Sequence, residues 1–163
     1  MITNVSLTTV YCLDQTATRD FYVDVLGFES RVDLPMGPDA RWVTISHPNQ
    51  PELEVTLMKP GPPLAPDAAD FVRRQLEKGQ MGGLGLRVDD CRKTHQELVG
   101  KGQMGGLGRT VDDCRKTYDE LSALGVEFVQ EPSERPYGVE AVMRDVSGNW
   151  LVLVEPRAFT PEG

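Results

Sequence analysis

Few side chains of this sequence have the chemistry of a catalytic nucleophile or of a metal ligand. The chain has two histidines, His47 and His95, too few partners for a Ser/His/Asp or Cys/His nucleophile. Its cysteines are Cys12, Cys91 and Cys114, and no CxxC motif or Cys/His pair has the spacing of a zinc site. We therefore expect reduced thiols without a disulfide framework. His47 stands beside a turn proline and is expected in a solvated loop.

Charge and hydropathy exclude several classes of partner. The formal net charge is −8, whereas nucleic acid and anionic membranes reward clustered Lys and Arg. No stretch approaches the ~20 apolar residues of a membrane helix. The N-terminal residues lack the basic segment and apolar run of a secretory signal. We expect a cytoplasmic protein without a nucleic-acid or membrane partner.

The first half of the chain has the pattern of one helix among four strands. Residues 4–13 are rich in Val and Thr and alternate in polarity, which predicts a strand. Residues 16–28 place Phe21, Val25 and Leu26 at helical spacing before Gly27. Three strand-like runs follow, at 28–35, 40–47 and 52–59, separated by Pro/Gly turns. The order is β-α-β-β-β.

The second half repeats this order once a duplication is removed. Residues 78–100 and 101–123 are identical at 17 of 23 aligned positions. Each copy predicts a strand and a helix, and strand-like runs follow at 126–131, 137–145 and 149–156. We predict an α+β fold in a single domain, 1–163. It comprises module one at about 1–60, a connector with a short helix at about 60–79, module two at about 80–156, and a tail at 157–163.

The segments "FYVDVLGFES", "GGLGLRVDD" and "DVSGNWLVLVEP" resemble the vicinal oxygen chelate superfamily, which includes glyoxalase I, extradiol dioxygenases and bleomycin-resistance proteins. The resemblance spans nearly the whole chain. It implies paired βαβββ modules that form an open, barrel-like sheet around a ligand cavity, and dimers. It does not fix an activity, because this scaffold hosts both enzymes and binders.

The resemblance also implies four strand positions that hold a divalent ion in metal-dependent members. They fall on Leu7, Glu54, Gly83 (or Gly106 in the second copy) and Val152. Only Glu54 offers a lone pair suited to such an ion. We therefore expect no metal site and no cofactor.

Strand alternation assigns the side chains that line the implied cavity. Glu54 is the candidate catalytic residue, either as a general base, with Tyr11 as a further acid–base group, or as a partner for a ligand cation. Its structural alternative is an ion pair with Arg87 or Arg41, or a position near solvent. The candidate ligand-binding residues are Leu7, Tyr11, Trp42, Glu54, Met58, Arg87, Tyr137, Glu140, Trp150 and Val152.

The two copies of the duplication differ in quality. In the first strand copy Leu84, Leu86 and Val88 form an apolar face, whereas Arg109 replaces the middle leucine in the second. The second helix copy is the more apolar one. We therefore expect the first strand and the second helix to complete the module, with about 95–117 as a surplus insertion. Alternatively, the strand copies compete for one position, which would permit register exchange or a domain-swapped dimer.

The sequence thus predicts a metal-independent protein, similar to bleomycin-resistance proteins, that binds a small organic molecule between its modules, with a homodimer as its assembly. Three alternatives stay open. One is a Glu54-based lyase, isomerase or dioxygenase, and another is a metal-dependent enzyme of the same superfamily. The third is a domain-swapped or scaffold-like variant without activity. Whether the protein catalyses a reaction is left open.

Overall fold

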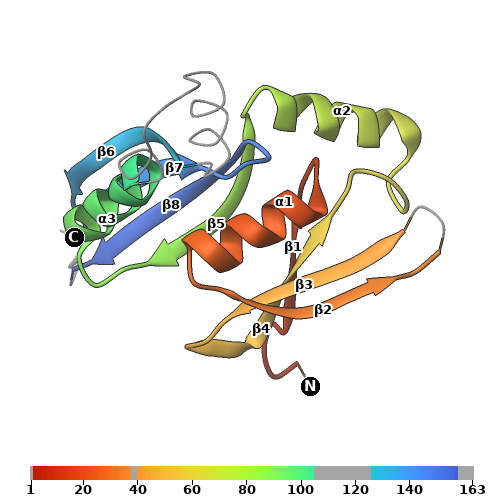
Figure 1. The fold of residues 1–163 in the computed structure, drawn as a ribbon, viewed down its shortest axis with the longest axis horizontal. Coiled ribbons are helices and arrows are strands. Elements are labelled where there is room, and N and C mark those ends of the chain that lie inside the picture. The colour runs from red at the N-terminus through yellow and green to blue at the C-terminus, as the bar shows by residue number, and fades with distance from the viewer. Residues whose placement is uncertain (1, 38–39, 105–125, 158–163) are drawn as a thin grey trace. The chain divides into compact units, whose positions relative to one another are not determined.

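Two four-stranded sheets carry the fold (Figure 1). The computed structural model describes residues 2–37, 40–104 and 126–157. The chain divides into unit 1, residues 1–81 with 147–149, and unit 2, residues 82–146 with 150–163. Each unit holds one of the two expected modules, and the connector with its helix belongs to unit 1.

Sheet A of unit 1 has the strand order β1-β4-β3-β2, with β1 parallel to β4 and the other neighbours antiparallel. Its strands are β1 (Leu7–Tyr11), β2 (Glu29–Pro35), β3 (Arg41–His47) and β4 (Gln50–Met58). Helix α1 (Gln15–Asp20) and the π-helical segment η1 (Phe21–Val25) connect β1 to β2. The Asp14 carboxylate caps α1 at the Thr16 and Ala17 amides. The helical stretch ends near Gly27, whose φ is +78°.

The core of unit 1 lies between one face of sheet A and the helical segment. Alternate residues of β1, β3 and β4 are buried on this face, namely Val10, Val43, Ile45, Val55 and Leu57. The fully buried Tyr22 makes edge-to-face ring contacts with Phe21 and Phe28, at centroid distances of 5.7 and 5.4 Å. The expected solvated His47 is instead half-buried, because its ring packs edge-on against Phe28.

A short segment from the C-terminal part of the chain completes unit 1. Ser147 Oγ accepts a hydrogen bond from the Leu13 amide (3.0 Å) and shares another with the Thr18 hydroxyl (2.9 Å). Asn149 donates to the Tyr11 carbonyl oxygen (2.8 Å). Between them, Gly148 adopts φ +85°, and a Cβ there would lie 2.2 Å from the carbonyl oxygen of Leu76 at the end of α2 (Pro66–Glu77).

Sheet B of unit 2 has the equivalent order, β5-β8-β7-β6. Its strands are β5 (Met81–Arg87), β6 (Glu127–Arg135), β7 (Gly138–Arg144) and β8 (Asn149–Pro156), and α3 spans Cys91–Met104. Among the described residues of this unit, the buried hydrophobic side chains are Cys91, Leu98, Val139, Ala141, Met143, Leu151 and Leu153. The predicted α+β fold of paired βαβββ modules with open sheets is therefore confirmed.

The duplication is divided between described and undescribed residues. β5 and the start of α3 both come from the first copy, and α3 includes His95 and Leu98. The predicted surplus at about 95–117 thus begins inside α3, and its part from 105 onward lies outside the described residues, as do Gly106, Arg109, Cys114 and the second helix copy. Of the predicted tail, only Arg157 is described.

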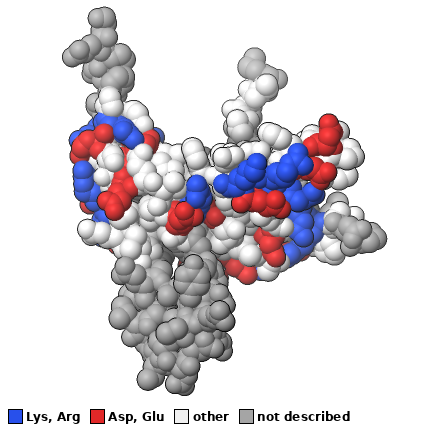
Figure 2. Space-filling view, turned by 90° about the horizontal axis from the view of Figure 1, so that it is seen from above, with Lys and Arg blue, Asp and Glu red and all other residues white. Residues whose placement is uncertain are grey.

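The described cysteines are buried, and the described surface carries charges of both signs. Cys12 and Cys91 are both fully buried, and burial raises the pKa of the Cys91 thiol, an effect to which the nearby Glu155 carboxylate adds. Figure 2 shows Lys and Arg interspersed with Asp and Glu on the described part of the face in view. Among the described helices, none has the length and apolar character needed to cross a membrane.

Candidate ligand-binding faces

The predicted site residues of module one share the face of sheet A that carries Glu54, opposite the core; we call it the Glu54 face. Strand register orders its side chains into three rows. The aromatic row contains Tyr11, Met58 and Trp42, the hydroxyl row contains Thr9, Thr56 and Thr44, and the carboxylate row contains Leu7 and Glu54. The structure therefore brings Leu7, Tyr11, Trp42, Glu54 and Met58 together on one surface.

The aromatic and carboxylate rows are partly accessible. Tyr11, Trp42, Met58 and Glu54 are half-buried, and Leu7 is 44% exposed. Among the described residues, the Glu54 carboxylate forms no hydrogen bond or ion pair, and Arg41, its expected structural partner, binds Asp33 instead. Arg87 ends β5 with an exposed side chain in unit 2. Glu54 thus presents an uncommitted carboxylate.

The hydroxyl row contains buried hydroxyl groups that lack hydrogen-bond partners. Thr44 and Thr56 are register partners with exposed fractions of 0% and 1%. Neither hydroxyl has a hydrogen-bond partner, and the buried Ser46 hydroxyl, on the same face of β3, also lacks one. Thr44, Ser46 and Thr56 are not among the candidate ligand residues predicted from the sequence, although they alternate with core residues as Trp42 and Met58 do. Unsatisfied buried hydroxyls are uncommon in native proteins and call for an explanation.

A second polar group lies on sheet B, on the face opposite the core of unit 2. Tyr137 donates its hydroxyl proton to Glu140 (2.5 Å), and Gln130 and Arg135 donate to the other carboxylate oxygen, each at 3.3 Å. Arg135 also donates to Gln130 (2.9 Å). The Tyr137 hydrogen bond is the main cause of a lowered pKa at Glu140 and of a raised pKa at Tyr137. Sequence reasoning named Tyr137 and Glu140 but missed Gln130 and Arg135.

Trp150 and Val152 occupy the same face of sheet B as Glu140. Register places Trp150 opposite Arg144 and Val152 opposite Val142, while the intervening Leu151 is buried in the core. Trp150 is 45% exposed. This face therefore presents an indole, aliphatic side chains and a hydrogen-bonded carboxylate in three successive rows.

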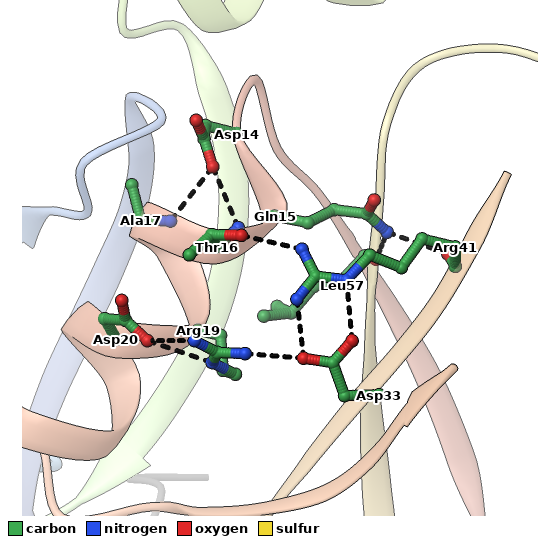
Figure 3. A network of polar contacts seen from close by, with 9 residues as sticks. All are labelled: Asp14, Gln15, Thr16, Ala17, Arg19, Asp20, Asp33, Arg41 and Leu57. Atoms are coloured by element: carbon green, nitrogen blue, oxygen red, sulfur yellow. Dashed lines mark hydrogen bonds and ion pairs between the residues drawn. The ribbon is translucent and has the colours of Figure 1, made fainter. Parts of the chain in front are cut away.

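A network of ion pairs holds α1 against the other side of sheet A (Figure 3). Asp33 on β2 accepts two hydrogen bonds from Arg41, both 2.6 Å, and one from Arg19 of α1. Arg41 also donates to the Thr16 hydroxyl (2.6 Å). The buried Gln15 amide donates to the carbonyl oxygens of Leu57 (2.8 Å) and Arg41 (3.0 Å). These bonds fix the strands that carry Trp42 and Met58.

An open surface pocket of about 510 Å³ lies beside this network. Its lining residues are Asp14, Gln15, Thr16, Pro35, Gly37, Ala40, Arg41 and Lys59. None of these is a predicted ligand residue, and the side chains of Asp14, Gln15 and Arg41 are already hydrogen-bonded. We therefore assign the candidate site to the sheet faces rather than to this pocket.

The metal implied by the resemblance does not fit the side chains present. Leu7 is the register partner of Glu54, and β5 and β8 supply Gly83 and Val152. Three of these four positions offer no side-chain lone pair. Among the residues that the structure describes, no three His, Cys, Asp or Glu side chains gather closely enough to hold an ion.

Comparison with known proteins agrees with this fold. Residues 5–153 match the model of the Glyoxalase/Bleomycin resistance protein/Dioxygenase superfamily. The crystal structure of UcmS2 is 35% identical with a TM-score of 0.72, covering 95% of this chain and 99% of that one. TnmS3, an antibiotic binding protein from Streptomyces sp. CB03234, is 25% identical with a TM-score of 0.64, covering 96% and 98%.

A curated relative gives the same picture. The uncharacterized protein YurT of Bacillus subtilis is 26% identical over 149 residues, which cover 91% of this chain and 96% of YurT. The family match extends over both modules, including the strands of the Glu54 face and most of β8. The chain therefore belongs to the Glyoxalase/Bleomycin resistance protein/Dioxygenase superfamily.

Proposed function

We propose that the protein binds a small organic molecule that has a flat ring and polar substituents, and that it does so without a metal ion. The observation that carries the proposal is the pairing of two rows on the Glu54 face. A flat ring can stack against Trp42, and a ring carbonyl or hydroxyl can satisfy the buried hydroxyls of Thr44 and Thr56. A ligand would thus supply the hydrogen bonds that these side chains lack.

The comparisons favour binding over chemical conversion. TnmS3, similar over nearly its whole length, is described as an antibiotic binding protein. Three of the four implied metal positions of this chain have no side-chain lone pair, which also supports binding without a metal-dependent reaction. We therefore propose sequestration of an antibiotic-like molecule as the function. Because the Thr44 hydroxyl is covered in the free protein, a neighbouring side chain has to turn aside during binding.

The test is a binding titration with defined probes. Suitable probes are planar aromatic compounds with carbonyl and hydroxyl groups, beginning with 1,4-dihydroxyanthraquinone, and binding is followed by isothermal calorimetry. We expect saturable binding at one site per chain, unchanged by EDTA. Trp42→Leu should weaken it more than about tenfold, and Thr44→Val about fivefold to tenfold, the equivalent of one hydrogen bond.

A matched control distinguishes binding at the Glu54 face from non-specific binding to exposed apolar side chains. Phe71 lies on α2, is 56% exposed, and is not part of sheet A. Phe71→Leu should leave the dissociation constant unchanged. Equal losses in Trp42→Leu and Phe71→Leu would refute a site on the Glu54 face, and loss of binding with EDTA would refute metal independence.

An acid–base enzyme is the second candidate, and the uncommitted Glu54 carboxylate is the observation that favours it. A carboxylate beside bound substrate can accept a proton, which glutamine cannot do. Incubation with each bound probe, followed by mass spectrometry, distinguishes the two functions. Turnover that is lost in Glu54→Gln while binding persists would establish the enzyme; unchanged probe would support the binder.

A further inference from the structure

The position of β5 and α3 on sheet B is occupied by the first copy of the duplicated sequence. β5 is an edge strand next to β8, and the Val88 amide after it donates to the Val154 carbonyl oxygen (2.9 Å). In α3, Cys91 is fully buried and Leu98 is 5% exposed. The Cys91 amide donates to a Glu155 carboxylate oxygen (3.0 Å). These contacts define what a segment needs in order to complete sheet B.

Nearly all of these contacts come from residues that are identical in the second copy. The start of α3 is held by the Asp90 side chain, which accepts from the Lys93 amide (2.8 Å), and by an Arg92–Glu134 ion pair (2.8 Å). The identical residues in the second copy are Val111, Asp113, Cys114, Arg115, Lys116 and Leu121, each 23 positions further on. The second copy therefore has the same residue type at every one of these contact positions.

The substitutions between the copies fall where the structure tolerates them. Leu86 becomes Arg109, but Leu86 is only half-buried in an edge strand, so a long side chain there can reach solvent beyond the edge. His95, whose ring centroid is 4.2 Å from that of Phe128, becomes Tyr118, another ring. The charge at Arg109 therefore does not exclude the second copy from this position.

Identical local sequence also adopts two conformations within the chain. Lys78–Met81 comprise the C-cap of α2, a turn at Gly79 with φ +64°, and the first residue of β5. Lys101–Met104 have the same four residues and continue helix α3. Tertiary context, rather than local preference, thus decides which part of a copy becomes strand and which becomes helix.

We propose that residues 104–121 can replace residues 81–98 on sheet B, so that the folded protein exchanges between two arrangements. In the alternative arrangement the connection before the strand lengthens by the 23 residues of one copy, and the connection to β6 shortens by the same number. Because the entropy of loop closure depends only weakly on length, these two changes largely offset each other. Both arrangements bury an equivalent Cys and Leu, so neither is strongly preferred.

Leucine truncation in each copy tests the exchange in the full chain. We would measure thermal unfolding of Leu98→Ala, Leu121→Ala and the double variant. Exchange predicts that each single variant shifts the midpoint by less than about 2 °C, because the intact copy takes over. The double variant should fall by roughly 5–15 °C, as expected for an unavoidable buried cavity. A fall in one single variant equal to that of the double variant would overturn the proposal.

Deletion of one whole copy provides the second measurement. Removing residues 78–100 leaves only the second copy, and removing 101–123 leaves only the first, each with a chain of 140 residues. We expect both variants to unfold cooperatively with the circular dichroism spectrum of the parent. If the chain lacking residues 78–100 fails to fold while the other folds, the second copy is incompetent and the proposal is wrong.

Discussion

Replacing the hidden hydroxyls of sheet A should make the protein more stable, which is the reverse of the usual effect of a core substitution. Thr44 and Thr56 each bury a hydroxyl that has no hydrogen-bond partner. Valine has nearly the same shape but no polar atom to desolvate. An unsatisfied buried polar group costs about 1–3 kcal/mol, so removing one should return about 1 kcal/mol at least.

The expected gain is large enough to measure. Thr44→Val should raise the free energy of unfolding by about 1 kcal/mol and the melting temperature by roughly 2–4 °C, with about twice that for Thr44→Val/Thr56→Val. Urea unfolding at pH 7, followed by far-UV circular dichroism, gives the free energy directly. Thr9→Val is the matched control, because Thr9 lies in the same row but is exposed, so its stability should not change.

A loss of stability in Thr44→Val would refute this reasoning, since it would mean that the hydroxyl already has a partner. Equal gains in Thr44→Val and Thr9→Val would refute it differently, because they would reflect the strand preference of valine rather than burial. A gain confined to the buried positions, together with weaker probe binding, would show that stability has been exchanged for a binding surface.

Three further predictions concern the polar contacts of both units. Asp33→Asn should lower the free energy of unfolding by about 1 kcal/mol at pH 7. Because the hydrogen bonds from Arg41 and Arg19 lower the pKa of Asp33, this loss of stability, measured by urea unfolding, should vanish as the pH falls below about 4. Asp70→Asn, at a more exposed ion pair, should show no comparable loss. Gly148→Ala should lower the free energy of unfolding by more than about 2 kcal/mol, because φ is +85° and the new Cβ would clash with the Leu76 carbonyl oxygen. At Gly85 a Cβ would meet no atom within 4 Å, so Gly85→Ala should be tolerated. Similar urea midpoints for the two variants would contradict this prediction. Tyr137→Phe should raise the pKa of Glu140 in an NMR carboxyl titration, and an unchanged pKa would show that the hydroxyl does not stabilise the carboxylate.

The sequence was sufficient to predict the module order and the faces of the regular strands. In β4, Val55 and Leu57 alternate with Glu54, Thr56 and Met58, and this period of two distinguishes the core face from the opposite face without further information. Gly27 likewise predicted the end of the first helical stretch, and its positive φ explains why. The π-helical turn before it has no comparable local signal.

Contacts between distant residues could not be predicted from the sequence. Ser147 and Leu13 are 134 positions apart, and nothing in either segment indicates a hydrogen bond between them. The sequence could not predict that the Thr44 and Ser46 hydroxyls lack hydrogen-bond partners either, because hydrogen bonding depends on every neighbour in space. The duplication defeats local reasoning most directly, since one tetrapeptide forms a turn and strand start in one copy and helix in the other.

The segment from Ser147 to Asn149 determines when, during synthesis, unit 1 can complete its hydrogen bonds. The ribosome releases the strands and helices of unit 1 well before residues 147–149, yet the Leu13 amide, the Thr18 hydroxyl and the Tyr11 carbonyl find their partners in that later segment. Until that segment has emerged from the ribosome, these polar groups of unit 1 stay hydrated. Unit 1 therefore reaches its full stability only after residue 149 has been synthesised.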